Sequence, residues 1–474
     1  MVRAETASST RAWAEEEFGT ANLGDKRRNK RLIGMAERAA VAPSGKVSEV
    51  FDEAAERQCA YDFLESPHVD VRDMLAAMGR AVAQRSADHP FVFVPVDGTS
   101  LKLVDRACSK DFGPIGTQKQ KSRGLKVISA LGVSAEGVPL GVAAMRYWVR
   151  PDEQGIARTR TKRTLEEKEL RYWNETIDQA IEGLSVEGGP KLLWFQLDRE
   201  ADAWPILEHL ASAGHTYTVR GSWNRRVRET GAQRRYILDV LASRKPMGTY
   251  TLHVSAGPGR TARTARTSIR TASVTLDVRD KQTGKRHPLH TNVVWVREEG
   301  RVPEGEERVE WLLLTNHPIE TLEDACLVVF GYTQRWRIEE FHRTWKQGGC
   351  NVEATQLQTS EHVKRWATLL AAVAMRIERL KYLSRNHPDL PATEELSRYE
   401  IDALILKRRK RKNPRIPEGI LTIGVATQWI AELGGYTGKS SGGPPGSVTI
   451  GRGLERLAPA AETLQQLDAA GLLR

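Results

Sequence analysis

The sequence predicts an α/β fold with a helical segment at each end. Between about residue 90 and residue 220, apolar runs of strand length alternate with amphipathic helical segments in the order β-β-β-α-β-α-β. The chain of 474 residues is too long for one ordinary hydrophobic core, so two or three domains are expected. Toward both ends, the apolar residues recur at helical spacing instead.

The first segment, residues 1–70, is predicted to be a small helical module with a basic face. Asp25 is placed to cap a helix. Behind it, apolar residues recur every three or four positions, and Arg27, Arg28 and Arg31 belong to a cluster of cations. When such a cluster stands alone, a solvated helix face is its simpler explanation, because most charge runs are only that.

Three consecutive strands are predicted to form a meander at the start of the middle segment. The run FVFVPVD ends at Asp97, LKVISALGV begins at Leu125, and VPLGVAAMRYWV begins at Val138. Because these runs are continuously apolar or alternate with a period of two, strands are favoured.

A helix, a strand, a second helix and a further strand are predicted to follow. The charged helix covers about residues 164–182, and the strand KLLWFQLD ends at Asp198. An amphipathic helix over residues 201–213 and the strand TYTVR, which ends at Arg220, complete the pattern.

Residues from about 222 to 310 are predicted to form an inserted β subdomain. The segment alternates Thr, Val and Arg, contains TARTARTSIR from Thr261 and lacks long helical periodicity. Its arginines fit a surface that flanks DNA, and equally an edge strand protected by charge. The chain then resumes with the strand WLLLT from Trp311, a long helix over about 321–347 and helices over 362–384.

The last segment, residues 391–474, is predicted to be helical and suited to packing against a partner. The basic run KRRKRK at 407–412 is, in isolation, usually a solvated loop. A short helix over 426–435, a SSGGPPG linker and a leucine-containing helical stretch follow. The α/β domain is therefore assigned to residues 71–390.

Composition favours a polyanionic partner and a cytoplasmic location. Lys plus Arg number 71 against 60 Asp plus Glu, a net charge of +11, which makes nucleic acid the first candidate partner. The four cysteines lie far apart without metal-ligand spacing. Residues 1–18 lack the apolar core of a secretory signal, and the longest apolar stretch, around 366–375, is too short to cross a membrane.

Two aspartates are candidate catalytic acids because each ends a predominantly apolar strand. A carboxylate in that place is presented where a buried sheet meets solvent. One such aspartate is more often a turn or cap residue than a ligand. Asp97 and Asp198 occupy equivalent positions, which favours a shared site.

A third acid lies on the predicted helix after the last strand. There Tyr332, Arg335, Glu339 and Lys346 are separated by three, four and seven residues, which places all four on one helix face. A solvated charged stripe is the alternative, but an aromatic, two cations and one acid favour phosphate handling. Because Mg²⁺ prefers oxygen ligands, three carboxylates can hold two ions, and two ions about 3.5–4 Å apart can drive an in-line phosphoryl displacement.

In this order, these residues resemble the bacterial insertion-sequence DDE transposases, specifically the hairpin-forming branch that contains the transposon-five transposase. The likeness spans nearly the entire chain. It is carried by LGDKRRNKRL near the start, VDGTSL at Asp97, KSRG at Lys121, DREAD at Asp198, WLLLT at Trp311 and YTQRWRIEEFHRTWKQG from Tyr332.

The resemblance implies an RNase H-like catalytic core that carries the inserted β subdomain. Asp97, Asp198 and Glu339 would be the catalytic and metal-binding acids, holding two Mg²⁺ ions for which Mn²⁺ can substitute. The tyrosine, arginine, glutamate and lysine signature of the branch falls on YTQRWRIEEFHRTWK and selects Glu339 over Glu340 as third ligand.

The resemblance also implies DNA contacts outside the acids. The flanking helical regions would serve transposon-end binding at the N-terminus and dimerisation at the C-terminus. Trp311 occupies the position of an aromatic that receives a flipped base, with a core tryptophan at a strand start as the alternative. Trp336 is expected to pack. The implied DNA-contacting residues are Tyr332, Arg335, Lys346, Arg27, Arg28, Arg31, Arg123, Arg220 and Arg225.

Two features limit the resemblance. Glu200 and Asp202 of DREAD invite assignment as further ligands, but a helix that begins there favours acids in its first turn regardless of chemistry. In IGRGLERL, from Ile450, aliphatic residues stand where aromatics are common in the family. The metal site is therefore limited to three acids, and the details of the dimer contact stay open.

The function implied is cut-and-paste transposition of double-stranded DNA by a homodimer. One site would nick the transposon end, form a hairpin, open it and transfer the end into target DNA. One alternative is a transposase-like regulator that binds DNA or dimerises without cutting. A second is an RNase H-like nuclease without strand transfer, which needs the same acids but no paired ends.

Overall fold

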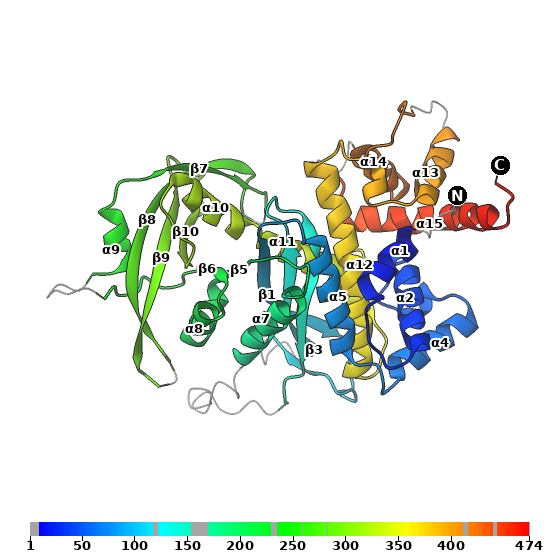
Figure 1. Cartoon of the computed structure of the whole chain (residues 1–474), viewed down its shortest axis with the longest axis horizontal. Helices are drawn as coiled ribbons and strands as arrows, with labels where there is room; N and C mark the ends of the chain where they lie inside the picture. Colours follow the sequence, from blue (N-terminus) through cyan, green and yellow to red (C-terminus); the bar gives the residue numbers. More distant parts are fainter. Residues whose placement is uncertain are drawn as a thin grey trace.

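The computed structural model describes residues 9–116, 122–152, 169–228, 235–257, 259–281, 283–410, 416–438 and 443–473. These residues form a mixed α/β structure around one large sheet. The strand order is β2-β3-β1-β5-β6-β10-β9-β8-β7, with β4 pairing to β3. Helices from both ends of the chain lie together on the side of the molecule away from β7, β8 and β9 (Figure 1).

The predicted meander is confirmed. Strands β1 (Val92–Leu103), β3 (Ser122–Val133) and β4 (Pro139–Trp148) pair antiparallel in sequence, and the short β2 (Gly113–Ile115) adds to the free edge of β3. One boundary was wrong, because β1 does not end at Asp97. It continues to Leu103, since residues 97–103 pair with β3 in unbroken register.

The alternation after the meander is also confirmed. Helix α7 (Arg171–Leu184) precedes β5 (Leu193–Leu197), and α8 (Trp204–Ser212) joins β5 to β6 (Thr216–Arg220). The first residues of the predicted charged helix, 164–168, lie outside the described residues. Strand β5 pairs parallel with both β1 and β6 and is buried throughout, as expected for a central parallel strand.

The segment that follows is rich in strands, as predicted. Strands β7 (Gly248–Val254), β8 (Arg263–Arg279) and β9 (Arg286–Glu298) form antiparallel pairs. Strand β10 (Glu310–Thr315) joins β9 to β6, so these strands continue the central sheet. A short helix, α9 (Ile237–Ala242), precedes them.

The single long helix predicted over 321–347 was wrong. The chain forms two helices, α10 (Leu322–Thr333) and α11 (Trp336–Lys346). Between them the backbone tightens, because Arg335 N donates to Tyr332 O at 3.2 Å and Arg337 N donates to Gln334 O at 3.0 Å, both three residues back. The apolar periodicity runs through this turn, so the sequence pattern does not reveal it.

The terminal segments are helical, as predicted. The N-terminal helices are α1 (Ser9–Phe18), α2 (Lys26–Val41), α3 (Val47–Val50), α4 (Ala54–Glu65) and α5 (Val71–Arg85). The carboxylate of Asp25 caps α2 by accepting from Arg27 N at 2.7 Å. The C-terminal helices are α13 (Arg398–Arg409), α14 (Ile423–Leu433) and α15 (Ser447–Ala469). Residues 411–412 of the basic run and residues 440–442 of the linker lie outside the described residues.

One long helix, α12 (Ser360–Asn386), packs against all of these parts. Its Arg365 donates to Val69 O at 2.8 Å, and Trp366 donates to Gly45 O at 2.9 Å, so it holds the N-terminal helices. Ala367 O accepts from the indole of Trp345 on α11 at 2.8 Å. The largest buried cluster accordingly includes residues from α2, α11, α12 and α15. The domain boundaries at residues 70 and 390 stay a prediction.

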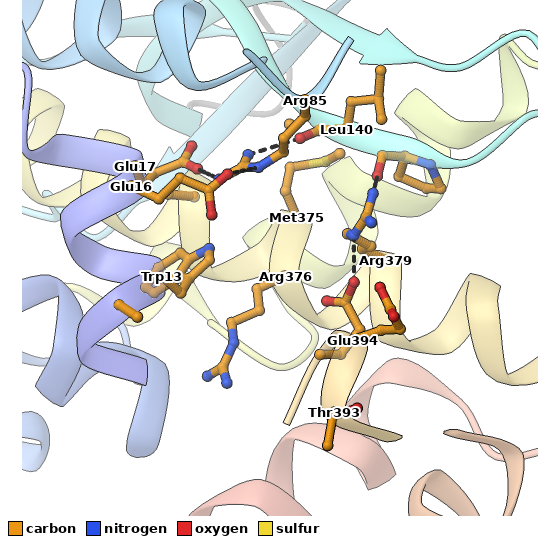
Figure 2. A pocket seen from close by; sticks show the side chains of 15 residues that line it. Trp13, Glu16, Glu17, Arg85, Leu140, Met375, Arg376, Arg379, Thr393 and Glu394 are labelled. Atoms are coloured by element: carbon orange, nitrogen blue, oxygen red, sulfur yellow. Dashed lines mark hydrogen bonds and ion pairs between the residues drawn. The ribbon is translucent and has the colours of Figure 1, made fainter. Parts of the chain in front are cut away.

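A cavity of about 290 Å³ lies where α1, α5, β4 and α12 meet (Figure 2). Arg85 lines it and donates to Glu16 and Glu17, each at 2.6 Å, and to Leu140 O at 2.8 Å. Arg379 lines the same cavity and donates to Pro139 O at 2.9 Å. The hydrogen bonds of these two arginines therefore connect α1 and α12 to β4 around the cavity.

Within the ranges that the structure describes, none of the helices combines the length and the apolar character needed to span a membrane.

Candidate active site

The two aspartates lie next to each other because two parallel strands are in register. Val96 of β1 pairs with Leu197 of β5. Asp97 follows Val96, and Asp198 follows Leu197 directly after the end of β5. Strand β5 ends there, so the edge of β1 that faced it becomes open at Asp97. Asp198 caps the short helical turn that follows, accepting from Glu200 N at 2.8 Å.

Glu339 approaches these aspartates from the first turn of α11. Arg335, the residue before this helix, donates through Nη1 to Asp97 Oδ2 at 3.2 Å and through Nη2 to Glu339 Oε1 at 2.5 Å. The guanidinium therefore lies between two of the three predicted acids. Asp97 and Arg335 are mostly buried, whereas the Glu339 side chain is 36% exposed.

The position of Asp97 changes its acidity. Burial raises the pKa of its carboxyl to about 7, and the charges of Asp198 and Glu339 contribute in the same direction. Arg335 and the Gly98 N–H, which donates at 2.8 Å, oppose this rise. Asp97 is thus close enough to Asp198 and Glu339 to be repelled by both carboxylates, and a bound cation would relieve that repulsion.

Tyr332, Arg220 and Trp311 form the wall beside the acids. Tyr332, at the end of α10, is 3% exposed, and burial raises the pKa of its hydroxyl against the opposing charges of Arg335 and Arg220. Burial lowers the pKa of Arg220, although a hydrogen bond to Tyr332 opposes this. The half-buried Trp311 ring meets that of Tyr332 edge-on, with centroids 5.1 Å apart. Gly331 permits the packing of α10, because a Cβ there would lie 2.5 Å from the Phe93 ring.

Lys346 and Glu340 have different surroundings although both belong to α11. Lys346 Nζ donates to Thr99 Oγ1 at 3.1 Å. Thr99 follows Asp97 by two residues on β1, so the ammonium group of Lys346 lies near the acids. Glu340 accepts from Arg337 at 2.9 Å and from Lys381 at 3.3 Å. Glu340 is therefore engaged in ion pairs on another face of the helix, and Glu339 is the acid directed toward Asp97.

The broken helix changes one prediction about this group. Tyr332 lies on α10 and Arg335 in the turn before α11, so the four residues do not share the face of a single straight helix. Tyr332 and Glu339 both approach Arg335 because the turn brings them there. The expectation that Trp336 packs was also wrong, since it is 45% exposed and Arg335 lies over its ring.

The remaining predicted DNA contacts fall into two classes. Arg27 and Arg31 on α2 are exposed, and Arg28 donates to Leu23 O at 2.7 Å. Arg123 is held by Asp105 at 3.2 Å and by Asp152, and Arg225 is held by Asp202. In this structure Arg123 and Arg225 thus take part in internal ion pairs, whereas Arg27 and Arg31 face solvent.

The donor set suits a hard divalent cation, although Arg335 lies between Asp97 and Glu339. Within the described ranges, no three His, Cys, Asp or Glu side chains are gathered tightly enough to hold an ion as they stand. Asp97, Asp198 and Glu339 supply only oxygen donors, which Mg²⁺ prefers, and a cationic guanidinium already lies among them. The residues fit a metal provided that Arg335 moves away from Asp97 and Glu339.

One residue that sequence reasoning missed anchors α11 beside the acids. His342 follows Glu339 by three residues and is buried, with a ring nitrogen 3.2 Å from Ser129 Oγ. Ser129 is the partner of Asp97 in the β1–β3 pairing. The spacing from Glu339 is visible in the sequence, but the partner on β3 is not.

Two protein families match this chain. Residues 10–69 match the family described as Transposase DNA-binding, and residues 166–376 match the Transposase DDE domain. The first range contains the exposed arginines of α2. The second contains Asp198, Trp311 and Glu339, whereas Asp97 lies before its start.

Proposed function

We propose that this chain, a DDE transposase that binds DNA and acts on it as a nuclease and strand transferase, moves its element by a cut-and-paste mechanism of the hairpin-forming branch. The observation that supports this most directly is the position of Asp97, which lies near both Asp198 and Glu339 and shares the guanidinium of Arg335 with Glu339. The order of the elements that carry them, β1, β5 and α11, agrees with an RNase H-like core.

The acids and their neighbours divide the work of phosphoryl transfer. DDE transposase domains use divalent metal ions, and here Asp97, Asp198 and Glu339 would hold two Mg²⁺, for which Mn²⁺ can substitute. Bound metal would activate the attacking oxygen and stabilise the leaving oxygen. Arg335 and Lys346 bind phosphate oxygens, and Tyr332 fixes the position of Arg335 from its buried side.

Each chemical step breaks one phosphodiester bond. Water is the attacking group in the two hydrolytic steps, and a 3′-hydroxyl is the attacking group in the two transfer steps. In the nick, a water oxygen bonds to phosphorus and the 3′-oxygen of the transposon strand leaves. That 3′-hydroxyl then attacks the opposite strand, which closes a hairpin and releases the flanking DNA. Water opens the hairpin and regenerates the 3′-hydroxyl, which attacks a target phosphate and displaces the 3′-oxygen of the cut target strand. Trp311 would receive a flipped base as the hairpin bends.

The exposed side chains of α2 fit recognition of transposon ends, and the C-terminal region fits dimerisation. Arg27 and Arg31 can neutralise phosphates without breaking an ion pair described in the structure. Leu472, after α15, is 70% exposed, but a single exposed leucine is ordinary, so the homodimer rests on the resemblance to the family. A homodimer would hold the two transposon ends together. Sedimentation of the chain with and without end DNA tests this state.

Cleavage of labelled duplexes tests the proposal. The duplexes carry the terminal inverted repeats that flank the coding region, and the intact chain is compared with Asp97→Asn and Glu339→Gln in Mg²⁺ on denaturing gels. Hairpins from the intact chain alone, with equal duplex binding by all three, support transposition. Linear breaks without hairpins favour a plain nuclease. Binding without any cut by the intact chain favours a regulator.

A further inference from the structure

Trp223 is an exposed tryptophan that no role assigned above explains. It lies three residues after β6 and is 57% exposed, although tryptophan is highly buried on average. Lys281, in the turn between β8 and β9, places Nζ 5.3 Å from the centroid of the indole. Two loops far apart in the sequence thus bring an aromatic face and a cation together, and these two residues are called the Trp223–Lys281 platform.

The loop that carries Trp223 is fixed on both sides of the tryptophan. Before it, Ser222 N donates to Asp202 Oδ2 at 2.6 Å and Ser222 Oγ donates to Arg199 O at 3.0 Å. After it, Arg225 pairs with Asp202 at 2.6 Å, with side chains only 10% and 0% exposed. A buried ion pair therefore holds an exposed tryptophan in place, which lowers the entropy cost of any contact that the ring makes.

The loop that carries Trp223 contacts the turn that follows Asp198. Arg199 directly follows Asp198, so the contact from Ser222 joins the loop to the turn that Asp198 caps. Arg220, which hydrogen-bonds Tyr332 in the site, precedes Trp223 by three residues. Three residues span at most about 11 Å. Because successive phosphates of one strand in duplex DNA are about 3.4 Å apart along the helix axis, Trp223 lies no more than about three base steps from Arg220.

We propose that the Trp223–Lys281 platform stacks an unpaired nucleobase of the DNA strand held at the three acids, a few nucleotides from the reacting phosphate. The inference rests on the proposed function and adds a subsite to it. A flat indole with a neighbouring cation matches the π face of a base and the phosphate beside it, and such stacking does not depend on sequence. The base must leave its pair, which is easiest next to a broken strand end.

Local fluorescence tests the stacking directly. The probe is the terminal-repeat duplex cut at the transposon end, with an unpaired three-nucleotide extension that carries 2-aminopurine. Binding is measured in EDTA, so that no variant cuts. Stacking on Trp223 quenches the probe in the complex with the intact chain. Trp223→Leu restores the fluorescence and weakens binding about tenfold, whereas Trp223→Phe keeps most of both effects.

Controls separate stacking from loss of apolar surface. Met247, which is 36% exposed, lies just before β7, and Met247→Ala should leave quenching and affinity unchanged. Lys281→Gln should weaken binding less than Trp223→Leu and reduce its salt dependence. A circular dichroism spectrum and melting temperature equal to those of the intact chain show that each variant is folded.

The outcomes distinguish this inference from the proposed function. If the intact chain forms hairpins in Mg²⁺ but Trp223→Leu binds and quenches as the intact chain does, the platform is overturned and transposition stands. An equal loss in Trp223→Leu and Trp223→Phe also overturns it, because aromatic stacking would survive in phenylalanine. If the intact chain neither binds nor cuts the terminal-repeat duplex, both proposals fail.

Discussion

The basic face of α2 and the acid site on β1, β5 and α11 are both rich in charge, but they hold it differently. Arg27 and Arg31 are exposed, and in the described part of the chain no ion pair engages their side chains. Asp97 and Arg335 are 14% and 9% exposed and contact each other. Exposed cations suit salt-dependent binding to DNA phosphates. Buried, paired charges suit a catalytic site, because their positions are fixed before the reaction.

The largest expected effect comes from removing charge in the acid site. Asp198→Asn, which preserves shape and the cap to Glu200 N, should lower the cleavage rate by about 10³-fold or more, because several kcal/mol of metal and transition-state stabilisation are lost. Single-turnover cleavage measures it. Affinity for the duplex, measured in parallel, should stay within about twofold, a small change on the affinity scale. If the affinity for the duplex fell as much as the cleavage rate, the acid site would contribute to DNA binding as well as to cleavage.

The geometry of Arg335 should matter more than its charge. Arg335→Lys keeps the cation but cannot present two nitrogens to a phosphate once the side chain has moved away from Asp97 and Glu339. Loss of that positioning should slow cleavage about 10²-fold. Arg337→Lys is the matched control, since Arg337 pairs with Glu340 outside the site. Equal effects of the two variants on the cleavage rate would refute a special role for the two terminal nitrogens of Arg335.

His342 should make the anchor of α11 sensitive to acid. Burial, followed by the charges of Lys346 and Arg335, lowers the pKa of its imidazole to about 3 from a usual 6.5. The unfolded chain therefore binds more protons below pH 6.5, so stability is complete above that pH and falls as the pH drops toward 3. Between pH 6.5 and 5 the loss is about 2 kcal/mol from this group.

Urea unfolding of His342→Gln checks this prediction. Glutamine keeps a polar group for Ser129 and does not titrate, so the variant should lose about 2 kcal/mol less than the intact chain over the same pH interval. Identical pH dependence in the two proteins would show that His342 is not held neutral.

The smallest effect is expected on α2, where each cation acts nearly alone. Arg27→Ala or Arg31→Ala should flatten the slope of log K against log salt by about 0.9 for each lost phosphate contact, with only a several-fold loss of affinity. Arg38 on the same helix already pairs with Glu462 at 3.0 Å and serves as the control. A slope that Arg38→Ala changes equally would remove the distinction between exposed and paired cations.

Much of the catalytic part could be predicted because its strands are short, apolar and sharply bounded. The strand TYTVR begins and ends at Thr216 and Arg220, and the cap at Asp25 is formed as expected. The neighbouring placement of Asp97 and Asp198 follows from parallel register. These features follow from local patterns that one sequence contains, together with general rules for how strands pair.

The differences arise where distant parts of the chain decide. Strand β1 runs past Asp97 because β3 continues to pair with it, although β5 has ended. The turn at Arg335 interrupts a helical pattern that shows no break. The pairing of Arg225 with Asp202 likewise depends on a contact between two loops. Spacing along the sequence does not report such contacts.

Helix α12 has a consequence for how the protein unfolds. Its 27 residues extend about 40 Å and are buried along most of that length. Through Arg365, Trp366 and Ala367, the same helix supports the DNA-binding helices and α11. Opening α12 would therefore release both at once, so we expect its central amides to exchange hydrogen only in the cooperative unfolding of the combined unit. Although the two regions are separate on the surface, we expect them to unfold in one transition.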